Sequence, residues 1–171
     1  MFNLPSTHFF IVTVDTQNLG TIKIYTYFLN FFPGYLHGTY RTIKHLLNHN
    51  MSIYTYILTH EGFYSLTLLN GILPKGVCHA DDLFYLWKPF FGYEIPLFGE
   101  DVSVSEILIN AWTNFAKHGN PTPNPESGFV WTPIESIFDY QYLNISGQNP
   151  TMSLNPEILL RMELWERVLG E

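Results

Sequence analysis

The spacing of apolar residues predicts one long amphipathic helix in the second half of the chain. Apolar side chains recur at intervals of three and four residues and fall on one helical face: Val104, Ile107, Leu108, Ala111, Trp112 and Phe115. Ser103 and Glu106 have the spacing of a capping box, in which each side chain bonds the backbone N–H of the other residue. Gly119 supplies a stop signal. The pattern therefore predicts a helix that begins near Ser103 and ends before Gly119.

Two more elements are predicted after that helix. Residues 120–125 form a proline-dense loop, and a short strand is predicted near residues 140–145. Asn155 then offers a cap, and a first-turn proline and a first-turn glutamate follow it. These signals predict a final amphipathic helix that runs to Leu169.

The first half of the chain is rich in strand-forming residues. Residues 8–14 and 21–32 are aromatic and strand-prone, and Gly20 separates them. Residues 34–87 have the pattern of a helix, a strand, a loop and a tight turn. Residues 88–102 are rich in proline, glycine and aromatic side chains, which predicts a loop.

The most informative stretch is residues 76–87, which reads GVCHADDLFYLW. Its small turn presents His79, and Asp81 or Asp82 can accept the first backbone N–H groups of the helical turn behind it. Three apolar side chains would tie the turn into a core: Phe84, Leu86 and Trp87. The pattern predicts an imidazole fixed at a loop tip. A purely structural histidine is the alternative interpretation of the same residues.

Composition narrows the classes of protein and of partner. The chain has 171 residues, enough for one domain, with 46% hydrophobic, 17% aromatic and 13% charged residues. So few charges are unusual for an independent soluble domain and indicate surfaces that pack against further protein. The net charge of −7 argues against nucleic acid or an anionic membrane as a partner. With one cysteine, no intrachain disulfide is possible.

The turn at residues 76–87 resembles the histidine loop of the type-B carboxylesterases, the cholinesterase-like family of α/β-hydrolases. The similarity is greatest to the insect alpha-esterase branch. Further segments resemble the family's landmarks in the same order: GTYRTI at 38–43, IYTY at 53–56, AWTNFAKHGNP at 111–121, WTP at 131–133, YLNI at 142–145 and RMELW at 161–165. Several motifs agree in order and spacing, so the resemblance is specific.

The resemblance implies an α/β fold, the C-terminal portion of an α/β-hydrolase with a partial sheet and flanking helices. Residues 34–171 are expected to be the C-terminal part of a carboxylesterase type-B domain, and residues 1–33 stay unassigned, with no counterpart in the family that we can place. The family's chemistry is acyl transfer by a serine–histidine–acid triad, in which His79 would be the general base. A small-molecule ester would be the substrate of the complete enzyme, with no cofactor and no metal.

The other parts of that machinery are not encoded in these residues. No Gly-x-Ser-x-Gly elbow occurs in the sequence, and no His-Gly-Gly-Gly oxyanion loop. The resemblance places the triad acid further upstream as well. We therefore expect a fragment, a truncated gene model or a decayed paralogue that is inactive alone and partners the missing N-terminal part of its own fold. A non-catalytic, esterase-like binding or adhesion module is the alternative.

Two other residue pairs have the composition of a metal site or a catalytic site. His45 and His49 have the i,i+4 spacing of a zinc clasp but lack a third ligand, which favours a solvated helix face. Cys78 and His79 are the residue types of a cysteine–histidine nucleophile pair, but the side chains of adjacent residues in a turn rarely point to one place. Cys78 is therefore expected to be a small buried side chain. The remaining histidines show no partner pattern: His8, His37, His60 and His118.

Two sequons make Asn50 and Asn144 candidate N-glycosylation sites if the parent protein is secreted. The first residues lack a basic region and a small-residue cleavage site, so no secretory signal is predicted. The compartment of the parent protein, secreted or cytoplasmic, stays open.

Overall fold

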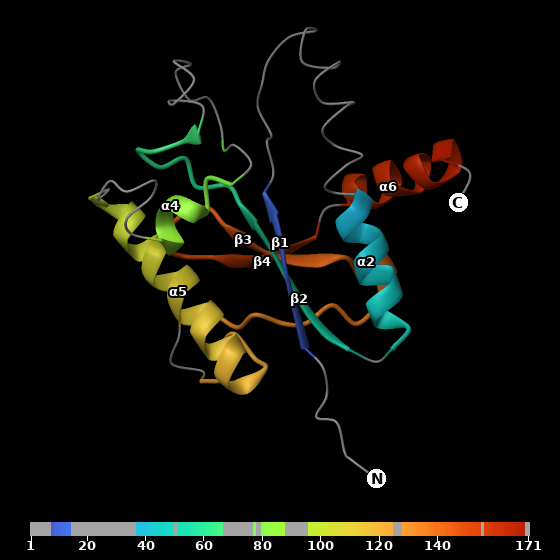
Figure 1. Cartoon of the computed structure of the whole chain (residues 1–171), viewed down its shortest axis with the longest axis horizontal. Coiled ribbons are helices and arrows are strands. Elements are labelled where there is room, and N and C mark those ends of the chain that lie inside the picture. The colour runs from blue at the N-terminus through green and yellow to red at the C-terminus, as the bar shows by residue number, and fades with distance from the viewer. Residues whose placement is uncertain are drawn as a thin grey trace, which may run out of the picture.

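A partial β-sheet with helices on both faces organises the chain (Figure 1). The computed structural model describes residues 8–14, 37–49, 51–66, 77, 80–87, 96–124, 128–154 and 156–169. The elements within these ranges are β1 (His8–Val14), α2 (Gly38–Leu47), β2 (Ser52–Leu58), α4 (Leu83–Leu86), α5 (Glu100–His118), the 3₁₀ turn η3 (Ile137–Asp139), β3 (Gln141–Ile145), β4 (Thr151–Leu154) and α6 (Pro156–Leu169). None of the helices in these ranges is long and apolar enough to span a bilayer.

The four strands of the described sheet lie in the order β1-β2-β3-β4. β1 pairs in parallel with β2, with His8 opposite Ser52. β2 pairs in parallel with β3, with Tyr56 opposite Leu143, and β3 pairs antiparallel with β4. Parallel pairing requires long crossover connections, and the segment that joins β2 to β3 carries the turn with the candidate histidine.

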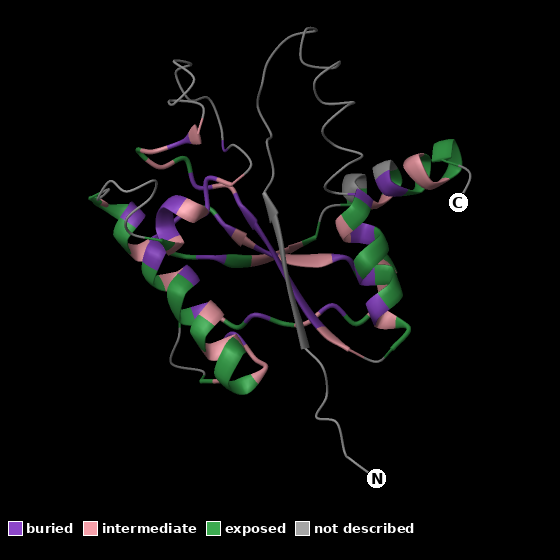
Figure 2. Cartoon of the chain, in the orientation of Figure 1, coloured by how far each residue is buried: buried purple, intermediate pink, exposed green. Residues whose placement is uncertain are grey.

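Side chains of β2 alternate between two separate hydrophobic cores because successive residues of a strand point to opposite faces. The α5-side core takes Tyr54, Tyr56 and Leu58 from β2 and packs them against α5. The α2-side core takes Ile53 and Ile57 and packs them against α2 and α6. Figure 2 shows buried residues on the sheet and on the sides of the helices that face it.

The long helix α5 begins three residues earlier than the sequence predicted. Gly99, with a φ of 54°, precedes Glu100, and the acidic side chains Glu100 and Asp101 occupy the first turn. The capping box that begins at Ser103 is therefore wrong, because both its residues lie inside the helix. The predicted stop is confirmed, since Gly119 is left-handed at the C-cap with a φ of 66°.

Most other predicted elements agree with the structure. The strand at residues 8–14, the helix and strand before the turn, and the strand near 140–145 are confirmed as β1, α2, β2 and β3. The final helix is confirmed from Pro156 to Leu169. β4 had no counterpart among the predictions, the predicted loop at 88–102 is helical from Glu100, and residues 21–32 lie outside the described residues.

Candidate functional site

His79, the predicted general base, and Cys78 beside it lie outside the described residues. The structure describes Val77 on one side of them and the chain from Ala80 onward on the other. Val77 is buried in the α5-side core. The structure therefore describes the surroundings of His79 through its neighbours in the chain, and the role of His79 itself stays a prediction.

A tight turn leads from the histidine position into α4. Ala80 has a φ of 69°, the left-handed region that a residue with a Cβ rarely adopts. The N–H of Leu83 donates to the carbonyl of Ala80 at 3.2 Å, which closes the turn. Such a conformation costs on the order of 1 kcal/mol and persists where the surroundings hold it, which is typical of functional sites.

The two aspartates of the turn act as anchors to other parts of the chain. Asp82 stands at the N-cap of α4 but makes no side-chain bond to the helix, so of the two aspartates predicted as alternative caps, Asp82 does not cap α4. Its Oδ2 accepts a hydrogen bond from the hydroxyl of Tyr56 in β2, at 3.0 Å. Asp81 Oδ1 accepts from the backbone N–H of Leu66, at 2.8 Å. The turn is thus bound to β2 and to the segment that follows β2.

Both anchors are buried, which makes their hydrogen bonds necessary. Asp81 and Asp82 are 4% and 5% exposed, and a buried carboxylate without partners is strongly unfavourable. Burial raises the pKa of Tyr56 well above its ordinary value, and the charge of Asp82 and the hydrogen bond to it add to the effect. Tyr56 therefore keeps its proton and remains a donor to Asp82 at neutral pH.

The apolar residues of α4 fasten the turn to the α5-side core. Phe84 is buried and Leu86 packs against the core, as predicted, but Trp87 is half-exposed and lies edge-on to Trp112. Tyr85, which the sequence did not single out, is buried, and its carbonyl accepts a hydrogen bond from Ser105 Oγ at 2.6 Å. α4 is therefore bound to α5 by packing and by a buried polar contact.

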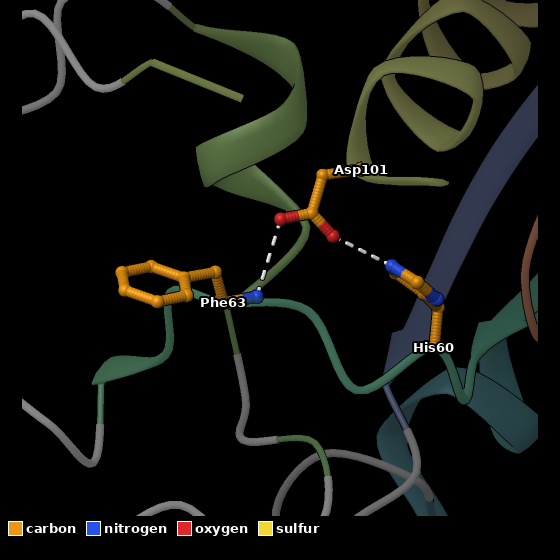
Figure 3. A network of polar contacts seen from close by, with 3 residues as sticks. All are labelled: His60, Phe63 and Asp101. Carbon is orange, nitrogen blue, oxygen red and sulfur yellow. Dashed lines mark hydrogen bonds and ion pairs between the residues drawn. The ribbon is translucent and has the colours of Figure 1, made fainter. Parts of the chain in front are cut away.

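A buried histidine–aspartate pair lies beside this turn and was missed at the sequence level (Figure 3). His60 Nε2 and Asp101 Oδ1 are 2.7 Å apart, and both side chains are buried. The backbone N–H of Phe63 donates to Asp101 Oδ2 at 3.2 Å. Forty-one positions separate the pair, so no local spacing signals it. The one available hint was an acidic residue near the start of a helix.

The His45–His49 pair behaves as the solvated face that was predicted. Both side chains are exposed, their ring centroids are 4.6 Å apart, and His49 Nδ1 bonds the carbonyl of His45. Within the described residues, no group of three or more His, Cys, Asp or Glu side chains is placed to hold a metal ion.

The two sequons differ in what can be described. Asn50 lies outside the described residues. Asn144 lies in β3, half-buried, and its side-chain oxygen accepts a hydrogen bond from Thr59 Oγ1 at 2.6 Å. Glycosylation at either position stays a prediction.

Known proteins resemble the chain in sequence over most of its length. Residues 30–159 match the sequence profile of the carboxylesterase family. Juvenile hormone esterase of Tribolium castaneum is 27% identical over 150 residues, which cover 77% of this chain and 25% of that protein. Bile salt-activated lipase of Bos taurus is 36% identical over 86 residues, 48% of this chain and 14% of that protein.

A solved structure resembles the chain in fold. The crystal structure of juvenile hormone esterase from Manduca sexta, with OTFP covalently attached, aligns with a TM-score of 0.57 and 19% identity. The alignment covers 71% of this chain and 23% of that one, so the chain spans about a quarter of the length of the two juvenile hormone esterases. The predicted fold class, part of an α/β-hydrolase with a partial sheet and flanking helices, is confirmed. The chain belongs to the carboxylesterase family.

Proposed function

We propose that this chain carries the general-base part of a carboxylic ester hydrolase, with His79 as the base of a serine–histidine–acid triad. The observation that carries the proposal is the turn that directly follows His79. Ala80 is held in a left-handed conformation. Two buried carboxylates of the turn accept hydrogen bonds from distant segments of the chain. Membership of the carboxylesterase family supports ester hydrolysis as the chemistry.

The proposed role of His79 is proton transfer. As the serine oxygen attacks the ester carbonyl, the imidazole takes the serine proton and then delivers it to the leaving alcohol. In the second half-reaction the imidazole activates water in the same way. Asp81 and Asp82 serve as anchors of the turn, because their oxygens already bind Leu66 and Tyr56. The serine, the triad acid and the oxyanion donors must then come from protein outside these residues.

The proposed substrate class is a small carboxylic ester, without a narrower assignment. The similar proteins are named as an esterase, a lipase and, in Rattus norvegicus, an acylcarnitine hydrolase. We place the chain in the insect alpha-esterase branch on the motif at residues 76–87, and its similarity to the Tribolium castaneum protein supports that placement.

Native size and active-serine labelling test the proposal together. An antibody raised to residues 100–171 would detect the natural protein, and a fluorophosphonate probe would label an activated serine in the same band. A labelled band far larger than 19.9 kDa supports the proposal, since the missing parts of the triad would then be present. An unlabelled band at 19.9 kDa removes ester hydrolysis as the function of this chain.

The second candidate function is a non-catalytic, esterase-like binding or adhesion module. Both candidate functions agree with a chain that carries no Gly-x-Ser-x-Gly elbow in these residues, so the sequence at the serine position elsewhere in the natural protein distinguishes them. A large band that stays unlabelled and whose upstream sequence carries another residue at the serine position would support this role.

A further inference from the structure

The buried side chains of His60 and Asp101, together with the backbone N–H of the exposed residue Phe63, form a clasp between the end of β2 and the start of α5 (Figure 3). Both carboxylate oxygens of Asp101 are used, Oδ1 by His60 Nε2 at 2.7 Å and Oδ2 by the N–H of Phe63 at 3.2 Å. The backbone N–H of His60 also donates to the carbonyl of Ile145 at the end of β3. Since the turn before α4 lies between β2 and α5 in the chain, the clasp closes the base of the segment that carries it.

The clasp is in direct contact with α4. The rings of His60 and Tyr85 lie edge to face with centroids 5.9 Å apart. Burial raises the pKa of Tyr85, with further contributions from the carboxylates of Asp101 and Asp81. Gly62 marks how close the packing is, because a Cβ at that position would collide with the Tyr85 hydroxyl and lie 2.7 Å from Asp101 Oδ1.

Residues 63–66, which follow His60 in the chain, are held at both ends. Phe63 is bound by Asp101, and three residues later the N–H of Leu66 is bound by Asp81, which is two residues past the candidate base. Movement of Asp101 would therefore shift the segment, and with it the partner of Asp81. Such a buried pair is a weak source of stability, since removing both polar groups from water costs about as much as their mutual contact returns. Its geometry is better suited to fixing one arrangement.

We infer that Asp101 and His60 are positioning residues for the turn at residues 80–82, and through that turn for the general base. The inference rests on the proposed function of His79. Neither side chain needs to touch a substrate, because both act through Phe63, Tyr85 and the segment that ends at Leu66. The inference adds to the family chemistry two residues that hold the base in place.

Amide hydrogen exchange of the full 171-residue chain tests the inference. Asp101→Asn leaves one acceptor oxygen in place of two, so either His60 Nε2 or the Phe63 amide loses its acceptor, and a change at Phe63 alone would be explained by any local role. The decisive probe is the Leu66 amide, which Asp101 does not touch. We expect it to exchange faster by about tenfold or more, while the amides of α2 keep their wild-type rates. If Phe63 exchanges faster and Leu66 keeps its rate, the clasp does not position the turn.

A matched glycine pair keeps the test decisive if Asp101→Asn does not fold. Gly62→Ala places a methyl group between Tyr85 and Asp101 without changing any charge, whereas Gly38→Ala adds one where no atom lies within 4 Å. Gly62→Ala should speed Leu66 exchange as Asp101→Asn does, and Gly38→Ala should not. Equal Leu66 rates in the two alanine variants would overturn the inference.

A spectroscopic readout on the base separates positioning from structure alone. The ring signals of His79, identified with a His79→Gln variant, should shift or broaden in Gly62→Ala, while those of the distant pair His45 and His49 stay in place. An unchanged His79 signal in a variant with altered Leu66 exchange would exclude positioning of the base. Neither readout requires turnover, so a failure here is distinct from a failure of the proposed hydrolysis.

Discussion

The two faces of β2 are built on different principles. On the α5 side, β2 presents Tyr56, whose hydroxyl supports a buried carboxylate, and the clasp of His60 and Asp101 lies close by. On the α2 side, the core consists largely of aliphatic and aromatic side chains. The ion pair on that side, between Lys44 and Glu166 at 2.8 Å, lies at the surface. The α5 side therefore adds buried carboxylates with specific partners to an apolar core, whereas the α2-side core is mainly apolar.

This difference indicates where the chain can tolerate change. An apolar core loses stability in proportion to the volume removed, but it tolerates many arrangements of similar volume. A buried polar network fails when a single partner is lost, because the remaining group stays unsatisfied. The α5 side thus has the properties expected around a catalytic group that must keep one position, and the α2 side those of a supporting layer.

The largest expected effect contrasts the proposed general base, His79, with a histidine of the α2 side. In the complete labelled protein, His79→Ala should lower turnover by on the order of 10³-fold to 10⁶-fold with the fold intact, because the serine loses its base. The control His45→Ala, on the exposed face of α2, should leave turnover unchanged. Steady-state ester hydrolysis and circular dichroism measure both. A loss of less than about tenfold for His79→Ala would remove it from the triad.

Removing volume from the α2 side should have a large effect on stability alone. Ile43 is fully buried, so Ile43→Ala should lower the free energy of unfolding by about 2–5 kcal/mol through lost burial and a cavity. Urea unfolding of the full chain measures the loss. Ile43→Ala should speed exchange of the Leu66 amide only as far as the lower global stability requires. A larger increase at Leu66 would show that the two faces are coupled.

Removing one hydroxyl from the α5 side tests its polar design. Tyr56→Phe leaves the buried Asp82 without that donor and should cost about 1–3 kcal/mol of unfolding free energy. Tyr54→Phe is the matched control, since Tyr54 lies on the same face of the same strand and burial is the cause of its raised pKa. Equal losses for the two variants in urea unfolding would contradict a special role for the Tyr56–Asp82 bond.

Alkaline pH should weaken the protein through the same tyrosine. The folded state raises the pKa of Tyr56, so it holds the phenolic proton more tightly than the unfolded chain. This contribution is fully present below about pH 10, the ordinary tyrosine value, and is lost as the pH rises above it, by up to about 1.4 kcal/mol per pH unit. Melting temperatures of wild type and Tyr56→Phe between about pH 9 and 11 should converge.

The smallest effect is expected at the surface of the α2 side. Lys44→Ala removes the ion pair with Glu166, but the lysine side chain is 49% exposed. Exposed pairs are screened by solvent, so the loss should be about 0.5 kcal/mol or less and should shrink further in high salt. A loss comparable to that of Tyr56→Phe in urea unfolding would break the contrast between the two faces.

Regular patterns made much of the fold predictable. Strand-forming residues located β1, β2 and β3, apolar spacing located α5, and the cap and proline before residue 157 located the start of α6. β4 escaped because it has only four residues, Thr151–Leu154: they alternate in polarity over too short a run to stand out, and their burial does not follow the alternation. The start of α5 was misplaced because Gly99, in a left-handed conformation, lets the helix begin without the predicted side-chain cap.

The candidate site was only partly predictable for a different reason. The motif at residues 76–87 identified the turn, but the partners of its carboxylates are Tyr56 and Leu66, which precede the turn by many residues. Local rules favoured capping for Asp82 because capping needs no knowledge of the fold. The pairing of His60 with Asp101 depends on where β2 ends relative to α5, which only the assembled sheet determines.

The register between β2 and β3 has a consequence for biosynthesis. Tyr56 in β2 pairs with Leu143 in β3, so a ribosome must translate most of the chain before that edge of β2 can find its partner. Contacts so distant in sequence slow folding, because a long loop must close before any ladder bond forms. Until then one backbone edge of β2 is unpaired, and its tyrosine and isoleucine side chains, which are buried in the folded protein, are exposed to the cytosol or to the translocation channel. Chaperone contact during synthesis should therefore concentrate on residues 52–58.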